Sequence, residues 1–309
     1  MRARSSFIIA LMVTLLGLVE PMGTSASARL QGEPTGTFDQ TLTVGGVERT
    51  YRVHVPGGRS PELGFPVLFV LHGGGGNAKQ VERSTGFSEL ADREGFIVVY
   101  PNGSGRFPRR LTWNAHNCCA YAYEENIDDV SFISALIDRI VADYHADSTR
   151  IYITGHSNGA MMTFRIACEL SEKIAAAAPN AGALNTDSCQ PVSPVAMLIM
   201  NGEDDTKVPV AGGTPTGSGP AGEYDRVDTP TSFAVDTWVR LDGCPGPATV
   251  VETPSSITRA WSGCEGGSEV EQVIIRGWEH SWPSAAAGAP IDGAHVIWDF
   301  VSRFSKAPA

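Results

Sequence analysis

The chain has 309 residues, of which 42% are hydrophobic and 18% charged, a composition that suits a folded domain with a sizeable core. Its 34 acidic residues outnumber its 23 basic ones, so the formal net charge is −11 at pH 7. Because a chain this acidic is a poor candidate for binding polyanions, we expect neither a nucleic-acid partner nor a membrane partner.

The first 28 residues are typical of a secretory signal peptide. Arg2 and Arg4 make a basic start, an apolar run covers 7–19, and the A-S-A sequence at 26–28 is a small-residue cleavage site. The apolar run is too short to span a bilayer, which argues against a membrane anchor. We therefore expect a secreted protein, extracellular or periplasmic, whose mature chain is a single domain of residues 29–309.

The start of the mature chain predicts strands. Two stretches of alternating apolar and polar residues, 38–44 and 47–55, flank a Gly-Gly pair and predict a β-hairpin. Continuous apolar runs at 67–71 and 96–102 predict strands covered on both faces, as in a parallel sheet. One short helix is expected between these two runs, near 84–93.

Later segments alternate between helix and strand patterns. The segment 103–126 has no periodicity and is expected to be a long loop or small lid. The remaining predicted elements are a helix at 127–144, a strand at 150–155, a helix at 158–171, strands at 174–179 and 195–201, a helix at 231–241, a strand at 269–275 and a helix at 294–304. This order predicts one α/β domain: a mostly parallel sheet with an N-terminal β-hairpin and helices on both faces.

Ser157 stands between two glycines where a strand is expected to end and a helix to begin, in Gly155-His156-Ser157-Asn158-Gly159. This pattern is typical of a nucleophile elbow, in which the glycines remove side chains that would collide with the strained serine turn. A serine hydroxyl attacks only when a base takes its proton. The chain must therefore also supply a histidine, a carboxylate and an oxyanion site.

The glycine-rich sequence LHGGGGN at 71–77 follows an earlier buried strand, where α/β-hydrolases place one oxyanion donor. We assign the backbone N–H groups of Gly74 and Asn158 as the donors, with Gly75 as the near alternative to Gly74. A phosphate loop is disfavoured because no G-K-[ST] follows, and the glycine spacing does not match a dinucleotide loop.

The base and the carboxylate are expected after the serine. His280 lies in the loop that follows the final predicted strand, and an acidic run of Glu203, Asp204 and Asp205 follows the strand at 195–201. Serine, acid and histidine in that order is the chain order of α/β-hydrolases. These patterns leave the choice of acid open among the three carboxylates.

Six cysteines, an even number in an exported chain, predict disulfide bonds. They are Cys118, Cys119, Cys168, Cys189, Cys244 and Cys264. We expect the last two to pair, and the third to pair with the fourth, which leaves the adjacent first two bonded to each other or to partners elsewhere. No C-x-x-C or H-x-x-x-H spacing occurs, so no metal site is expected.

These motifs together resemble the secreted α/β-hydrolases known as feruloyl esterases and polyhydroxybutyrate depolymerases, relatives of the carbohydrate esterases. The resemblance covers 37–304 and rests on LHGGGGNA, TWNAHNCCAYA, IDDVSFISALID, GHSNGAMM, NGEDDTKVP, GWEHSWP and VIWDF. In the family's acid loop the aspartate stands three residues before the valine of a Val-Pro pair, so the resemblance implies Asp205 as the acid. Asn201-Gly202-Glu203 departs from the His-Gly-Thr that relatives often have.

The resemblance implies a serine carboxylic-ester hydrolase with a Ser157–Asp205–His280 triad and no cofactor. Trp113, Trp278 and Trp282 lie in loops expected to border the site, where they could stack an aromatic acyl group or only pack the loops. A feruloyl-esterase-like activity on hydroxycinnamoyl esters of plant polysaccharide is the main expectation. A depolymerase of polyhydroxybutyrate or other short-chain polyester, and a non-catalytic binding protein, remain alternatives.

Overall fold

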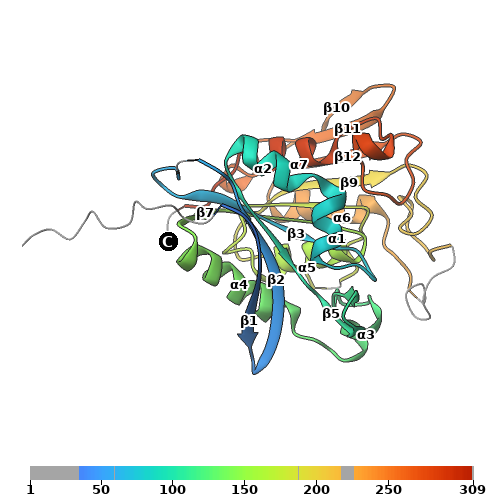
Figure 1. Ribbon diagram of the computed structural model, residues 1–309. Helices are drawn as coiled ribbons and strands as arrows, with labels where there is room; N and C mark the ends of the chain where they lie inside the picture. The colour runs from blue at the N-terminus through green and yellow to red at the C-terminus, as the bar shows by residue number, and fades with distance from the viewer. Residues whose placement is uncertain (1–34, 59, 187, 217–225, 308–309) are drawn as a thin grey trace, which may run out of the picture. The chain divides into compact units, whose positions relative to one another are not determined.

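The computed structural model describes residues 35–58, 60–186, 188–216 and 226–307 (Figure 1). The expected signal peptide, 1–28, lies outside the described residues. Ten strands form one sheet in the order β1-β2-β4-β3-β7-β8-β9-β12-β11-β10, and a separate hairpin pairs β5 with β6. Among the described residues, no helix combines the length and apolarity needed to cross a membrane.

The elements have the following bounds. The strands of the large sheet are β1 (Gly36–Val44), β2 (Val47–Val55), β3 (Phe65–Leu71), β4 (Ile97–Pro101), β7 (Ala146–His156), β8 (Ala176–Asn180), β9 (Ala196–Gly202), β10 (Thr249–Glu252), β11 (Ser256–Trp261) and β12 (Val270–Ile275). The hairpin consists of β5 (Ser104–Phe107) and β6 (Arg110–Thr112). The helices are α1 (Ala78–Thr85), α2 (Phe87–Glu94), α3 (Ala120–Glu124), α4 (Asp129–Asp143), α5 (Asn158–Glu169), α6 (Thr231–Leu241) and α7 (Gly293–Val301), with short 3₁₀ turns at Glu265–Gly267 and Ala285–Ala287.

The centre of the sheet is parallel and both of its faces are covered. Strands β4, β3, β7, β8, β9 and β12 run parallel, while the pairs at the two edges are antiparallel. All seven residues of β3 are buried, and Phe69 packs toward the face covered by α4, α5 and α6, whereas Leu68 packs toward α1, α2 and α7. The predicted fold class, an α/β-hydrolase fold with an N-terminal hairpin, is confirmed.

The structure differs from the sequence expectations at three places. The single helix expected near 84–93 is two helices, α1 and α2, because Gly86 adopts a left-handed φ of 74° and ends the first. The segment 103–126 holds the β5–β6 hairpin and α3, elements too short to show a periodicity. The antiparallel strands β10 and β11, which extend the sheet beyond β12, were not predicted.

The structure pairs all six cysteines. Bonds join Cys168 to Cys189 and Cys244 to Cys264, the two pairs expected from the sequence, and the adjacent Cys118 and Cys119 are bonded to each other. The first two bonds close loops with sequence separations of 21 and 20 residues. Closing loops of this length restricts the unfolded chain, which stabilises the native state.

We expect each of these two loop-closing bonds to contribute about 3 kcal/mol to the free energy of unfolding. Replacing Cys244 and Cys264 together by alanine should therefore shift the urea unfolding midpoint downward, and the Cys168/Cys189 pair should act similarly. Thiol titration of the unfolded, unreduced protein provides the control. Six reactive thiols there would contradict the disulfide framework.

Candidate active site

Ser157 occupies a sharp turn between β7 and α5. Its backbone has φ 59° and ψ −122°, a left-handed conformation that is unusual for a residue with a side chain. The flanking glycines are required by close packing. A Cβ on Gly159 would lie 2.5 Å from the carbonyl oxygens of Leu71 and His72, and a Cβ on Gly155 would collide with the carbonyl of Gly159. The turn thus places the hydroxyl at the end of the strand, as in a nucleophile elbow.

His280 lies between the serine and a carboxylate. Its Nε2 is 2.8 Å from Ser157 Oγ, and its Nδ1 is 2.7 Å from Asp205 Oδ2. The three residues follow β7, β9 and β12, so the sheet brings together positions separated by 123 residues of chain. Asp205 is 4% exposed, which shields its interaction with the imidazole from water.

Only one of the three candidate acids reaches the histidine. Asp205 Oδ1 accepts hydrogen bonds from the backbone N–H groups of Lys207 (2.8 Å) and Val208 (2.9 Å), which leaves Oδ2 for His280. Glu203 and Asp204 are exposed, and Glu203 Oε2 accepts from the N–H of Gly277 at 3.2 Å. The geometry agrees with the position that the family resemblance implied for the acid.

The oxyanion donors expected from the sequence lie around the serine. Gly74 and Asn158 both line the cavity at Ser157, and Asn158 is the first residue of α5, where the helix dipole favours negative charge. The N–H of Gly75, the near alternative, already donates to the carbonyl of Leu111 at 2.9 Å. This bond makes Gly74 the better candidate of the two.

A neutral histidine braces the glycine loop. Burial lowers the pKa of His72 to about 4, so its imidazole is uncharged at neutral pH. Its Nε2 accepts the N–H of Gly103 at 3.0 Å, and its Nδ1 lies 2.8 Å from the carbonyl of Gly73, which suits a donor at that nitrogen. The side chain therefore fixes the loop that carries Gly74 to the segment after β4.

Trp113 packs inside the fold, which is one of the two possibilities that the sequence left open for it. Its side chain is fully buried, and its indole N–H donates to the carbonyl of His72 at 2.9 Å. Its backbone is held at two points by the Asn158 side chain, whose Oδ1 accepts from the Trp113 N–H and whose Nδ2 donates to the Trp113 carbonyl. No face of this ring is open to a substrate, so the burial of Trp113 favours loop packing over stacking on an acyl group.

The other two tryptophans differ from each other. Trp282 is 8% exposed and lines the cavity, with its ring edge-on to that of His156 at a centroid distance of 6.3 Å. Trp278 donates its indole N–H to the carbonyl of Ser281 at 2.9 Å and packs partly against the core. It is not among the residues that line the cavity. Of the three tryptophans considered, Trp282 alone lines the cavity.

His156 adds an uncharged ring beside the histidine of the triad. Burial is the main influence that lowers its pKa to about 4, and the nearby His280 lowers it further. The two ring centroids are 4.9 Å apart, and His156 Nδ1 lies 2.9 Å from Asn180 Oδ1. Because His156 stays neutral, it does not oppose formation of an imidazolium at His280.

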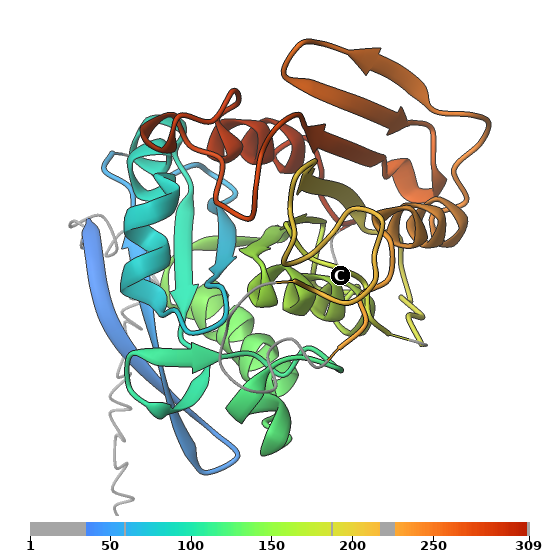
Figure 2. The same cartoon turned by 90° about the vertical axis from the view of Figure 1, so that its right-hand side faces the viewer.

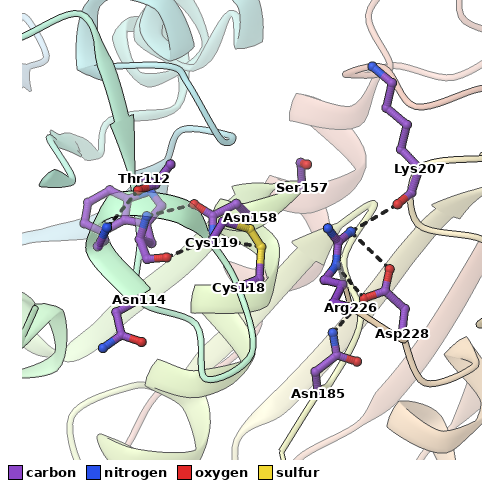
Figure 3. The surroundings of a disulfide bond; sticks show 12 residues. Thr112, Asn114, Cys118, Cys119, Ser157, Asn158, Asn185, Lys207, Arg226 and Asp228 are labelled. Carbon is purple, nitrogen blue, oxygen red and sulfur yellow. Dashed lines mark hydrogen bonds and ion pairs between the residues drawn. A yellow bond between two sulfur atoms is a disulfide. The ribbon is translucent and has the colours of Figure 1, made fainter. Parts of the chain in front are cut away.

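The cavity at Ser157 has a volume of about 200 Å³. Its walls include groups that the sequence analysis did not assign to the site: the Cys118–Cys119 disulfide, Lys207 and Arg226 (Figure 3). Lys207 could have been inferred from its place two residues after Asp205. Arg226 could not, because it reaches the site through contacts with Asp228 and with the carbonyl of Lys207.

A metal centre has no support in the described part of the chain, where no three His, Cys, Asp or Glu side chains gather in a way that could ligate an ion. At Ser157 the structure brings together a hydroxyl, an imidazole and a buried carboxylate, and Gly74 and Asn158 line the same cavity.

Curated relatives match most of this chain. It is 27% identical over 266 residues to a bifunctional acetylxylan esterase/xylanase of Neocallimastix patriciarum, a match that covers 84% of this chain and 34% of the relative. It is 29% identical over 263 residues to feruloyl esterase B of Piromyces equi, covering 82% of this chain and 45% of that protein. The chain thus spans a third to a half of the length of these two relatives.

A solved structure supports the same fold. The acetyl xylan esterase from Aspergillus awamori superposes with a TM-score of 0.59 at 17% sequence identity, over 86% of this chain and 99% of that one. The model of the esterase PHB depolymerase family matches residues 49–211, more than half of the chain, and this segment contains the glycine loop, Ser157 and Asp205. The chain belongs to the esterase PHB depolymerase family.

Proposed function

We propose that this protein is a serine esterase that hydrolyses carboxylic esters through Ser157, His280 and Asp205. The observation that carries the proposal is the position of His280, whose two ring nitrogens lie 2.8 Å from Ser157 Oγ and 2.7 Å from Asp205 Oδ2. This arrangement suits a general base that activates a nucleophile while a buried anion orients it. Membership of an esterase family supports the same reaction class.

The proposed reaction has two halves. In the first, His280 Nε2 takes the proton of Ser157 as Oγ attacks the ester carbonyl, and the N–H groups of Gly74 and Asn158 stabilise the oxyanion. His280 then protonates the departing alcohol, which leaves an acyl-enzyme. In the second half, His280 deprotonates a water molecule that attacks the acyl-enzyme, and it returns this proton to Ser157 Oγ as the bond to the acyl group breaks and the acid is released. Asp205 orients the imidazole and stabilises its cation throughout.

For the substrate, we propose acyl esters of plant polysaccharide, with a hydroxycinnamoyl group as the main candidate. Support comes from the names of the relatives, a feruloyl esterase and an acetylxylan esterase/xylanase, and from Trp282 in the cavity wall. The family description favours one alternative, a depolymerase of polyhydroxybutyrate or of another short polyester. The three disulfides and the pattern at 1–28 support a secreted protein.

The test compares the rates at which the protein hydrolyses several esters, each measured as acid released per molecule of enzyme. The wild type should hydrolyse p-nitrophenyl acetate and methyl ferulate, and should release ferulate from feruloylated arabinoxylan faster than it clears a polyhydroxybutyrate suspension. Ser157→Ala is the control in each assay. Absence of turnover above that control would reject the esterase in favour of a binding protein, and faster clearing of the suspension would favour the depolymerase.

A further inference from the structure

A second hollow adjoins the catalytic cavity across helix α1. Its volume is about 800 Å³, compared with about 200 Å³ at Ser157. Gln80 and Ser84 line both spaces, so the two hollows meet along one side of the helix. The larger one extends from α1 toward β1 and the β5–β6 hairpin, which lies next to α1 in Figures 1 and 2. The second hollow is more open to solvent than the catalytic cavity.

The charge of this hollow is opposite to that of the protein. Its lining contains four basic side chains and one acidic one: Arg52, Lys79, Arg83, Arg109 and Asp39. The whole chain, in contrast, has 23 basic and 34 acidic residues. Arg52 is engaged, because it contacts Asp39 at 3.1 Å and Glu82 at 2.8 Å. Within the described ranges, no carboxylate forms an ion pair with any of the other three cations, all of which are exposed.

These cations sit on elements that are tied to the expected oxyanion loop. Asn77 caps α1 through its Oδ1, which accepts the N–H of Gln80 at 3.0 Å, and its Nδ2 donates to the carbonyl of Arg109 at 3.4 Å. Gly76 and Leu111 form a β-bridge. These contacts hold the glycine loop, α1 and the hairpin in fixed positions relative to one another. A chain bound in the second hollow would be positioned relative to Ser157.

The hairpin also offers an apolar surface beside the charges. Phe107 is 66% exposed at the end of β5 and lines a separate hollow together with Pro108 and Arg109, two residues that also line the second hollow. Sugar rings present apolar faces that pack on aromatic rings, while arginine and lysine bind carboxylates through charge-assisted hydrogen bonds. An exposed ring next to unpaired cations is thus suited to a polymer that combines sugar rings with carboxylates.

We propose that the second hollow binds the alcohol side of the substrate and that Lys79, Arg83 and Arg109 recognise carboxylates on it. The substrate class is then an acyl ester carried by an acidic, uronate-bearing polysaccharide. The acyl group occupies the cavity at Ser157, and the polymer chain continues past Gln80 and Ser84. This inference rests on the proposed esterase function and adds the charge of the polymer to it.

The test removes the three charges together, as Lys79→Gln/Arg83→Gln/Arg109→Gln. A control with the same change in net charge removes three charges outside both hollows, as Arg139→Gln/Lys173→Gln/Arg240→Gln. Arg139 and Lys173 form ion pairs with Asp143 and Asp138, so thermal melts are needed to correct for any loss of stability in this control. Each protein is assayed on p-nitrophenyl acetate and on acetylated glucuronoxylan, and on the same glucuronoxylan after its carboxylates are converted to neutral amides. Salt is varied in each assay, because contacts between exposed charges weaken as ionic strength rises.

We expect the variant that lacks Lys79, Arg83 and Arg109 to lose about tenfold or more in kcat/KM on the acidic polymer, mainly through a higher KM. It should lose little on the amidated polymer. Wild type should prefer the acidic polymer at low salt, and p-nitrophenyl acetate should be hydrolysed equally by all three proteins. That last result also shows that the variant is folded. If the triple variant is not folded, Arg109→Gln alone is assayed. It should show a smaller loss of kcat/KM that is again confined to the acidic polymer.

Two results would overturn the inference. One is an unchanged kcat/KM of the variant of the second hollow on the acidic polymer. The other is a loss of kcat/KM in that variant that is equal on the acidic and the amidated polymers. Neither result contradicts the proposed esterase function if p-nitrophenyl acetate is still hydrolysed. A wild type that fails to hydrolyse p-nitrophenyl acetate, in contrast, removes the proposed function and this inference with it.

Discussion

Replacing Ser157 or His280 by alanine should lower kcat by about 10⁴–10⁶, and the double variant should lose little more than either single one. The reason is the 2.8 Å contact between His280 Nε2 and Ser157 Oγ, which makes the two side chains parts of one proton-transfer step. Once either is absent, the other has no partner for that step. Steady-state kinetics on p-nitrophenyl acetate measure the three losses.

A matched histidine variant separates this effect from general damage. His295→Ala changes a histidine on α7 that does not line the cavity, and it should leave kcat within a few-fold of wild type. Thermal melts should confirm that every variant is folded. Losses from Ser157→Ala and His280→Ala that multiply in the double variant would show that the two residues act in separate steps.

The central sheet was predictable because its strands carry a strong local signal. Burial on both faces demands an apolar residue at every position, and β3 meets that demand with seven buried residues in a row. The hairpin of β1 and β2 is marked by its alternation and by Gly45 and Gly46, both of which adopt positive φ. In these segments the local pattern was sufficient to predict a strand, although the strand partners lie far away in sequence.

The elements that sequence reasoning missed depend on distant partners. The helix pattern around Gly86 runs through a position where the backbone in fact turns left-handed, and a single glycine within such a pattern is ambiguous. Trp113 lies in a segment without periodicity, so the sequence could not decide between a substrate contact and loop packing. Its burial follows from the carbonyl of His72, which is 41 residues away in sequence, and from the side chain of Asn158.

The site shows the same division. Ser157 and His280 could be inferred because motif and chain order constrain them, whereas the acid required a resemblance to choose among three neighbours. The basic side chains that line the second hollow could not be predicted from a composition that is acidic overall. Charge summed over a chain gives no information on where its minority charges gather, and here Lys79, Arg83 and Arg109 line one hollow.

Asp205→Asn should keep the fold and lower kcat by about 10⁴. An asparagine can preserve the two hydrogen bonds that Oδ1 accepts from the N–H groups of Lys207 and Val208. Its amide nitrogen then replaces Oδ2 and faces His280 Nδ1, where it can only donate. The imidazole must accept at Nδ1 and carry its proton on Nε2, the nitrogen that should take the proton of Ser157.

The neighbouring acids are the controls for this prediction. Asp204→Asn and Glu203→Gln change exposed carboxylates, and each should alter kcat by less than about tenfold. All three variants are compared by kinetics on p-nitrophenyl acetate and by thermal melting, so that loss of activity can be separated from loss of structure. A crippled Asp204→Asn beside an active Asp205→Asn would mean that Asp204, rather than Asp205, orients His280 in the working enzyme. The short contact at Asp205 Oδ2 would then have no part in catalysis.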